Sequence, residues 1–238
     1  MSNIARFPFE FQQQDNIVVY DDFTRDIDSA EWVSTLTDSG TASVGDAVGG
    51  ILALVASDGT VADNDETYIE SPNEVFKLAA GKPIYAMAYV QFTEANTDDA
   101  NVFFGLADAI GANTLVDDGA GLKTSFSGAA IFKVDGGTVW KCITSNSTTQ
   151  TISTSSTTAG GASYQKLEID IQEFSSTACV VTFKVDGQRL LDSTTGLPIR
   201  HTILYASATE MQLGAGVKNG GANNETLNID YMGAVQVR

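Results

Sequence analysis

Short runs in which apolar and polar side chains alternate with a period of two fill this chain, and clusters of Gly, Asn, Asp, Ser and Thr separate them. Successive side chains of an extended strand point to opposite faces, so such runs predict strands with one buried face. The clearest runs are Ile17–Tyr20, Ile51–Val55, Ile84–Phe92, Asn101–Ala107, Ala129–Val134, Thr138–Ser145, Tyr164–Gln172, Ala178–Val185, Met211–Val217 and Thr226–Val237. The turn-rich spacing predicts an all-β, antiparallel two-sheet sandwich rather than alternating strands and helices.

The length favours one domain. The chain has 238 residues, of which 43% are hydrophobic, and all-β architectures of this size commonly keep a single core. Residues 1–16 differ from the rest, because three phenylalanines alternate there with Pro and Glu before a run of glutamines. We therefore expect a short N-terminal arm over residues 1–16 and one sandwich domain over residues 17–238.

The charge of the chain excludes one class of partner. Asp and Glu number 30 against 13 Lys and Arg, which gives a net charge of −17. Such a surface repels nucleic-acid phosphates and anionic lipids, so we expect neither nucleic acid nor membrane as a partner. The start shows no basic region followed by an apolar one, and no apolar run approaches the roughly 18 residues of a membrane span. Synthesis in the cytoplasm is the expectation.

Local turn signals predict hairpins. The pentapeptide Phe-Lys-Val-Asp-Gly occurs at Phe132–Gly136 and at Phe183–Gly187, and Asp-Gly readily takes positive φ in a tight turn. The polar stretch Thr144–Thr158 is either an outer hairpin or a loop, and Ser71–Glu74 begins either a short helix or an extended edge segment. Cys142 and Cys179 both lie in apolar runs, where we expect small buried thiols and no disulfide.

One acidic motif suggests an enzyme. Glu168, Asp170 and Glu173 match the Glu-x-Asp-x-x-Glu motif of a large family of jelly-roll glycosidases, in which a bulge would bring Glu173 to the face that carries Glu168 and Asp170. The motif is late in the chain, however, and neither Trp32 nor Trp140 neighbours it in sequence as an aromatic sugar platform. We therefore expect an ordinary strand, no catalytic residues and no enzyme, and keep a glycosidase as an alternative.

Other reactive constellations are weaker. His201 is the only histidine and is expected in a loop. The sequence contains no Gly-x-Ser-x-Gly motif, so a serine nucleophile paired with this histidine is not expected. One histidine and two distant cysteines do not make a zinc site. Clustered loop carboxylates leave a structural calcium ion as an alternative to plain solvated loops. These clusters are Asp63–Glu66, Asp98-Asp99 and Asp117-Asp118. No cofactor is expected.

Longer stretches resemble known families. Val19–Phe23, Phe92–Val102, Phe132–Trp140 and Gly216–Asn223 resemble a family of small structural proteins of tailed bacteriophages. The resemblance implies a virion component, a decoration protein on the outer capsid surface, with the major capsid protein and further copies of itself, as a trimer, for partners. Val181–Gly187 with Leu227–Tyr231 is similar to the late strands of concanavalin A-like and laminin-G-like domains, which implies a lectin or glucanase type of jelly roll.

Two roles follow from these resemblances. On a capsid, Phe7, Phe9 and Phe11 would contact the shell or a neighbouring copy, although the same alternation also fits the first strand of this domain's own sandwich. The alternative role is a glycan-binding module on a phage head or tail that recognises host-surface glycan. Such modules expose aromatic rings, whereas Trp32 and Trp140 lie in runs where burial is expected.

Overall fold

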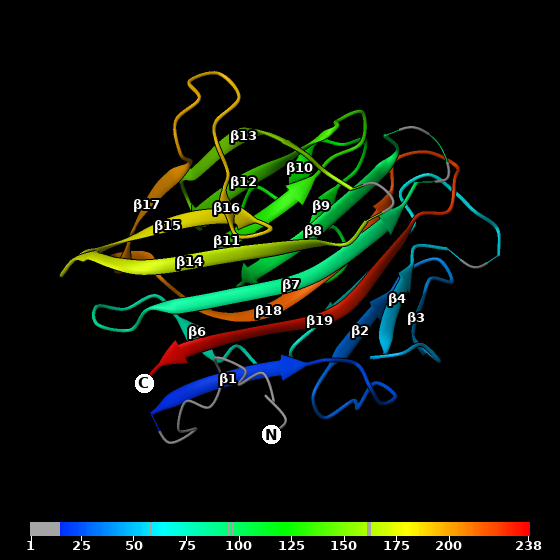
Figure 1. Cartoon of the computed structure of the whole chain (residues 1–238), viewed down its shortest axis with the longest axis horizontal. Helices are drawn as coiled ribbons and strands as arrows, with labels where there is room; N and C mark the ends of the chain where they lie inside the picture. The colour runs from blue at the N-terminus through cyan, green and yellow to red at the C-terminus, as the bar shows by residue number, and fades with distance from the viewer. Residues whose placement is uncertain (1–14, 58, 95, 97, 161–162) are drawn as a thin grey trace, which may run out of the picture.

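Two antiparallel sheets packed face to face form the protein, as the computed structural model shows (Figure 1). It describes residues 15–57, 59–94, 96, 98–160 and 163–238. Phe7, Phe9 and Phe11 lie outside these residues, so their contacts stay a prediction. The described part holds one short 3₁₀ helix, η1 (Tyr205–Ser207), and none of its helices is long and apolar enough to cross a membrane. The all-β sandwich expected from the alternation is confirmed.

The first sheet, sheet A, carries the surface of interest. Its strand order is β16-β15-β14-β7-β19-β4-β3, with β17 paired to β15, and with β1 paired to the part of β19 that lies beyond β4. The bounds are β1 (Asn16–Asp21), β3 (Thr41–Gly45), β4 (Ile51–Val55), β7 (Ile84–Thr93), β14 (Gln165–Ser175), β15 (Ala178–Val185), β16 (Gln188–Arg189), β17 (Arg200–Leu204) and β19 (Thr226–Val237).

The second sheet, sheet B, lies behind it in strand order β13-β12-β11-β8-β18-β5-β2, with β6 paired to β18. The bounds are β2 (Val33–Leu36), β5 (Glu66–Glu70), β6 (Phe76–Lys77), β8 (Ala100–Ala107), β11 (Ser127–Lys133), β12 (Val139–Asn146), β13 (Gln150–Thr158) and β18 (Glu210–Asn219). A separate small hairpin joins β9 (Leu115–Val116) to β10 (Gly121–Leu122).

One apolar core fills the space between the sheets. Every second residue of β7 points into it, from Ile84 to Phe92, and Phe104 and Leu106 of β8 meet them from sheet B. Trp140 is fully buried there and contacts Phe92 edge to face, with ring centroids 5.9 Å apart. Burial of this core is the main stabilising term of the fold, as the hydrophobic effect requires.

The turn predictions can be compared with the strands. Asp186 and Gly187 both take positive φ in the β15–β16 turn, and Gly136 does so between β11 and β12, which confirms both hairpins. Thr144–Thr158 covers the end of β12, the turn and β13, which confirms the hairpin. Ser71–Glu74 contains no helix, and its Pro72 and Asn73 form a bend before β6. Cys142 and Cys179 are buried free thiols, as expected.

The expected position of His201 in a loop is wrong. His201 is the second residue of β17 and is 3% exposed, because its ring takes a core-facing place in the alternation of that strand. Its Nδ1 is 3.1 Å from Thr144 Oγ1 of β12 and its Nε2 is 3.0 Å from Ser153 Oγ of β13. The imidazole therefore links sheet A to sheet B across the core.

Candidate binding surface

Four tyrosines form a continuous row on the outer face of sheet A, and we call them the tyrosine row. Tyr20 comes from β1, Tyr231 from β19, Tyr89 from β7, and Tyr164 immediately precedes β14. Successive ring centroids are 6.4, 5.5 and 5.0 Å apart in that order. All four rings are partly exposed. An aromatic surface thus crosses three neighbouring strands and reaches a fourth.

The register of the sheet produces this row. Tyr231 and Tyr89 are direct partners in the β19–β7 ladder, where side chains of paired residues lie side by side. A bulge at Asp230 adds one residue to β19, so that Ile229 and Met232 both stay in the core while Tyr231 points outward. Without the bulge, the alternation would direct one of these apolar residues to the outer face.

A glycine makes room for the end of the row. Gly233 faces Tyr20 in the β19–β1 ladder, and a Cβ atom on it would lie 2.7 Å from Tyr20 Cδ2 and 3.0 Å from the carbonyl oxygen of Val19. The Tyr20 ring therefore lies across the backbone of β19 in space that any other side chain would fill. The missing side chain brings Tyr20 against Tyr231.

Carboxylates flank one side of the row. Burial, followed by the nearby Asp22, raises the pKa of Asp230 above its ordinary value. Burial, with Asp230 next in importance, raises the pKa of Tyr231 to about 12. Burial and Asp22 also raise the pKa of Tyr20. The hydroxyls of Tyr231 and Tyr20 are thus neutral at physiological pH and can donate or accept hydrogen bonds beside two strong acceptors.

Glu168 borders the row on the other side. Its Oε1 accepts hydrogen bonds from the Tyr85 hydroxyl and from Lys166 Nζ, at 3.1 Å for the latter, and its Oε2 accepts one from the backbone N–H of Gly187 at 3.0 Å. Burial raises the pKa of Glu168, but the bonds from Tyr85 and Lys166 outweigh it and leave the pKa below its ordinary value. Glu168 is an ionised anchor for neighbouring side chains and the β15–β16 turn.

The acidic motif does not assemble a glycosidase site. Pairing of β14 with β15 is regular from Leu167 to Glu173, and the bulge comes only after Glu173. Residues five positions apart on a regular strand point to opposite faces, as Glu168 and Glu173 do here. A bulge between them would be needed to bring both to one face, and the structure has none there. Glu173 instead accepts a hydrogen bond from the backbone N–H of Gly81, in a different neighbourhood from Glu168.

The outer face of sheet B is covered. Residues 108–126, called here the covering segment, lie over β5, β8 and β11, and a second apolar cluster fills the interface. Beneath it Lys218 Nζ bonds to Glu66 Oε2 at 3.3 Å and to the carbonyl oxygen of Leu115 at 3.1 Å. Glu66 in turn accepts bonds from the Tyr68 hydroxyl and from the backbone N–H of Asn113. These contacts fasten the covering segment to the sheet.

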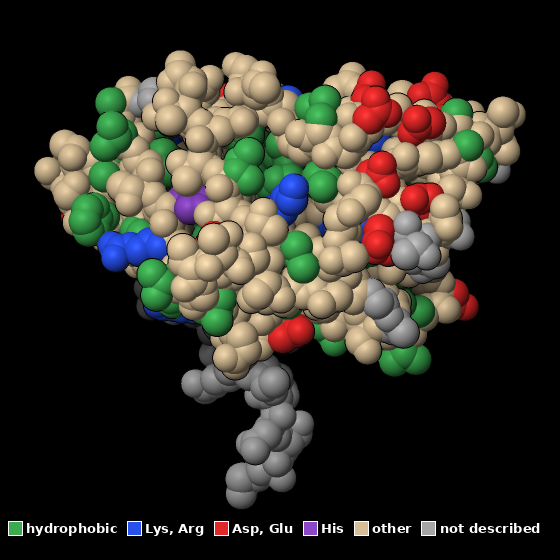
Figure 2. All heavy atoms as spheres, turned by 90° about the horizontal axis from the view of Figure 1, so that it is seen from above, with side chains coloured by type: hydrophobic (Ala, Val, Ile, Leu, Met, Phe, Trp, Pro, Cys, Tyr) green, Lys and Arg blue, Asp and Glu red, His purple; other side chains and the backbone are tan. Residues whose placement is uncertain are grey.

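In each of the three loop clusters that suggested calcium, at least one carboxylate has a protein partner. Asp65 accepts a bond from a backbone N–H of its own loop, and Asp99 accepts one from the Asn223 side chain at 2.8 Å. Asp117 pairs with Lys218. Figure 2 shows Asp and Glu gathered toward one end of the molecule seen from above. Among the described residues no three His, Cys, Asp or Glu side chains converge as a metal would require, so structural calcium stays a prediction.

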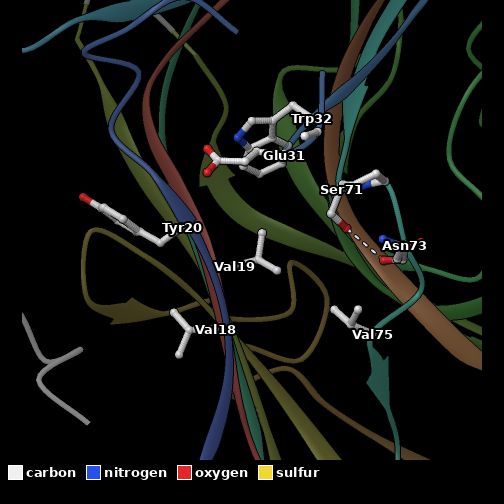
Figure 3. Close-up of a pocket in the computed structure, with 10 residues that line it drawn as sticks. Val18, Val19, Tyr20, Glu31, Trp32, Ser71, Asn73 and Val75 are labelled. Carbon is white, nitrogen blue, oxygen red and sulfur yellow. Dashed lines mark hydrogen bonds between the residues drawn. The ribbon is translucent and has the colours of Figure 1, made fainter. Parts of the chain in front are cut away.

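A pocket of about 250 Å³ lies beside β1, and Tyr20 of the row is one of its lining residues. Figure 3 shows Tyr20 directed away from Trp32 and Ser71, which line the pocket. Trp32 Nε1 donates to Asp21 Oδ2 at 2.9 Å, and Ser71 Oγ donates to the carbonyl oxygen of Asn73 at 3.3 Å. These two donors are already bonded to protein acceptors. The pocket therefore offers a ligand fewer free hydrogen-bonding groups than the row does.

Sequence reasoning missed the tyrosine row. The run Ile84–Phe92 was predicted as a strand with one buried face, but it is apolar at nearly every position, so the sequence did not mark tyrosines as its outward-facing residues. A weak signal was present, because Tyr85 and Tyr89 occupy one face of the strand while the small Ala86 and Ala88 occupy the core-facing one. Tyr20, Tyr164 and Tyr231 come next to Tyr89 only through the pairing of strands that are distant in sequence.

Comparison with solved structures identifies the fold. The carbohydrate recognition domain of Emp47p superposes with a TM-score of 0.60 at 10% identity and covers 94% of this chain and 97% of that one. Lectin I from Ulex europaeus, in complex with the methyl glycoside of α-L-fucose, gives 0.55 at 13% identity, with 94% and 98% covered. An endo-1,3-β-glucanase from Streptomyces sioyaensis gives 0.54 at 12% identity, with 92% and 95% covered.

No protein-family model and no curated protein sequence matches the chain. Identities this low show the fold alone. None of the three structures named above is a virion protein, so the capsid role and its partners stay a prediction from the resemblance. The chain is a jelly-roll sandwich of the concanavalin A and legume lectin type.

Proposed function

We propose that this protein is a non-catalytic glycan-binding module and that the tyrosine row is its binding surface. The observation that carries the proposal is the row itself, four partly exposed rings in mutual contact on the outer face of a lectin-like sandwich. Lectins and a glucanase share this fold, and they show that sugar recognition is compatible with it.

The chemistry of tyrosine suits a sugar. A pyranose ring has apolar C–H faces and a polar rim of hydroxyls, and a tyrosine offers an apolar ring and a hydroxyl that donates and accepts. Tyrosine also provides contact area at a low cost in conformational entropy. Asp22 and Asp230 add charged acceptors for sugar hydroxyls, and charge-assisted hydrogen bonds are stronger than neutral ones.

The acidic residues support binding rather than catalysis. Glycoside hydrolysis needs two carboxyl groups facing one bond across about 5 to 10 Å. Glu168 and Glu173 lie on opposite faces of β14, and both oxygens of Glu168 are engaged by protein donors. Neither residue faces the other across a groove, so the arrangement favours a surface that holds a sugar chain without cleaving it.

A glycan array followed by calorimetry tests the proposal. We expect the wild-type protein to bind immobilised glycans and Tyr89→Ala to lose at least about tenfold in affinity, or roughly 1.4 kcal/mol. Phe174→Ala is the matched control, because Phe174 is an aromatic residue of the same sheet that is 59% exposed and lies outside the row. A wild-type protein that binds no glycan, or equal losses in both variants, would contradict the proposal.

A further inference from the structure

We infer that the tyrosine row takes an extended, uncharged stretch of polysaccharide that runs across the strands and is recognised along its interior rather than at its end. The inference rests on the proposed function and adds the class of ligand. It depends on three observations, which are the direction of the row, its form as an open surface and the charge around it.

The direction of the row sets the direction of the ligand. Its rings come from β1, β19 and β7, which are neighbours in sheet A, and from the residue before β14, the next strand. The line of rings therefore crosses the strands. Its steps of 5.0 to 6.4 Å are close to the length of one sugar ring in an extended chain. Successive sugar units can each contact one tyrosine.

The form of the row favours the interior of a chain. Binding the end of a glycan requires a concave site that encloses the terminal unit. Tyr231 and Tyr89 instead stand on the surface of a sheet, paired across two central strands, and Tyr20 and Tyr164 continue the surface on either side. Affinity should then grow with each unit added until the row is covered, because every unit adds its own contact area.

The charge of the surroundings selects against acidic sugars. Asp22 and Asp230 lie beside the rings on one side, and Glu168 on the other is ionised. Glu168 is balanced by Lys166, which is bonded to it, and by Lys184, its partner in the β14–β15 ladder. The repulsion therefore comes from Asp22 and Asp230. Carboxylated or sulfated chains bring like charges within a few ångströms of these groups, closer than the Debye length of about 8 Å at physiological salt. Uncharged chains avoid this repulsion.

A chain-length series tests the inference on the intact protein. The probes are β-1,3- and β-1,4-linked gluco-oligosaccharides, from the monosaccharide to the hexasaccharide, measured by isothermal titration calorimetry. We expect no measurable binding of glucose, rising affinity with length, and a plateau near the tetrasaccharide that matches the four rings. Equal affinity for the monosaccharide and hexasaccharide, or no binding of either series, would overturn the inference.

A charged derivative tests the electrostatic part. Carboxymethyl-β-glucan should bind at least about tenfold more weakly than its unmodified parent at low salt, and high salt should reduce the difference. Asp230→Asn should raise the affinity for the derivative relative to that for the parent. A derivative that binds as tightly as its parent at low salt contradicts this part.

The two proposals fail in different ways. A Tyr89→Ala variant that binds as the wild type does removes the row as the site, and with it the proposed function. Binding that depends on Tyr89 but not on the length of the glycan leaves the proposed function standing and removes only this inference.

Discussion

Glu70 of β5 is 6% exposed, and among the described residues its Oε2 has no hydrogen-bond partner. Burial raises the pKa of Glu70 to about 7, against an opposing hydrogen bond from Thr35. Since the fold favours the protonated form, this group contributes its full stability below the ordinary pKa of 4.5, and the contribution is lost as the pH rises through 7.

Glu70→Gln should therefore stabilise the protein at alkaline pH. We expect a gain of about 1 to 3 kcal/mol at pH 8 and almost none near pH 4, because the amide stays neutral. Urea denaturation followed by tryptophan fluorescence measures both values. A gain that is the same at the two pH values would show that ionisation of Glu70 is not the cause.

His201 has the opposite pH dependence. Burial lowers its pKa to about 4, so the fold favours the neutral imidazole. Its contribution is fully present above the ordinary pKa of 6.5 and is lost as the pH falls toward 4. A Glu70→Gln background removes the opposing pH dependence of Glu70. In that background the free energy of unfolding should fall by about 2 to 3 kcal/mol between pH 7 and pH 4.5. The same loss after a further His201→Gln change would refute this assignment.

At the scale of elements, the covering segment depends on Lys218 of β18. Lys218 and Glu66 are 1% and 3% exposed as side chains, and removing one partner of a buried pair typically costs about 3 to 5 kcal/mol. Lys218→Met should lower stability by that amount and speed hydrogen exchange in residues 108–126. Lys77→Met is the control, because the Lys77–Glu210 pair is half exposed and should cost less than about 1 kcal/mol. Unchanged exchange in residues 108–126 would contradict this role.

Gly233 is the other element-level test, because it fixes how β1 lies against β19. Gly233→Val would place its side chain where the Tyr20 ring lies. We expect weaker binding of a gluco-oligosaccharide, together with a loss of about 1 to 3 kcal/mol in stability from overpacking. Tyr20→Ala in the same background should recover part of the stability but none of the affinity. Unchanged affinity in Gly233→Val would exclude a role for the Tyr20 ring.

Long alternating strands were predictable from the sequence. The runs Ile51–Val55, Ala178–Val185 and Thr226–Val237 coincide with β4, β15 and β19. Shorter or more polar strands were missed as separate elements, among them β2 and β3, because local alternation is weak where a strand borders solvent or has few apolar residues. Their existence depends on pairing with β5 and β4.

At the scale of the whole molecule, the two outer faces differ. The covering segment buries one outer face, whereas the other exposes the tyrosine row beside Asp22, Asp230 and Glu168. The sandwich was predictable from alternation, whereas the expectation that the protein is not an enzyme stays a prediction. The row was not predictable, because it unites residues more than 200 positions apart, from Tyr20 to Tyr231, through pairings that local sequence does not encode.

A crystal structure of the protein with a neutral gluco-tetrasaccharide tests the central claim most directly. The account predicts sugar units lying across β19 and β7, in contact with Tyr231 and Tyr89, and a chain direction that crosses the strands. A tetrasaccharide held instead at the acidic loops around Asp99, or in the pocket beside Trp32, would contradict it.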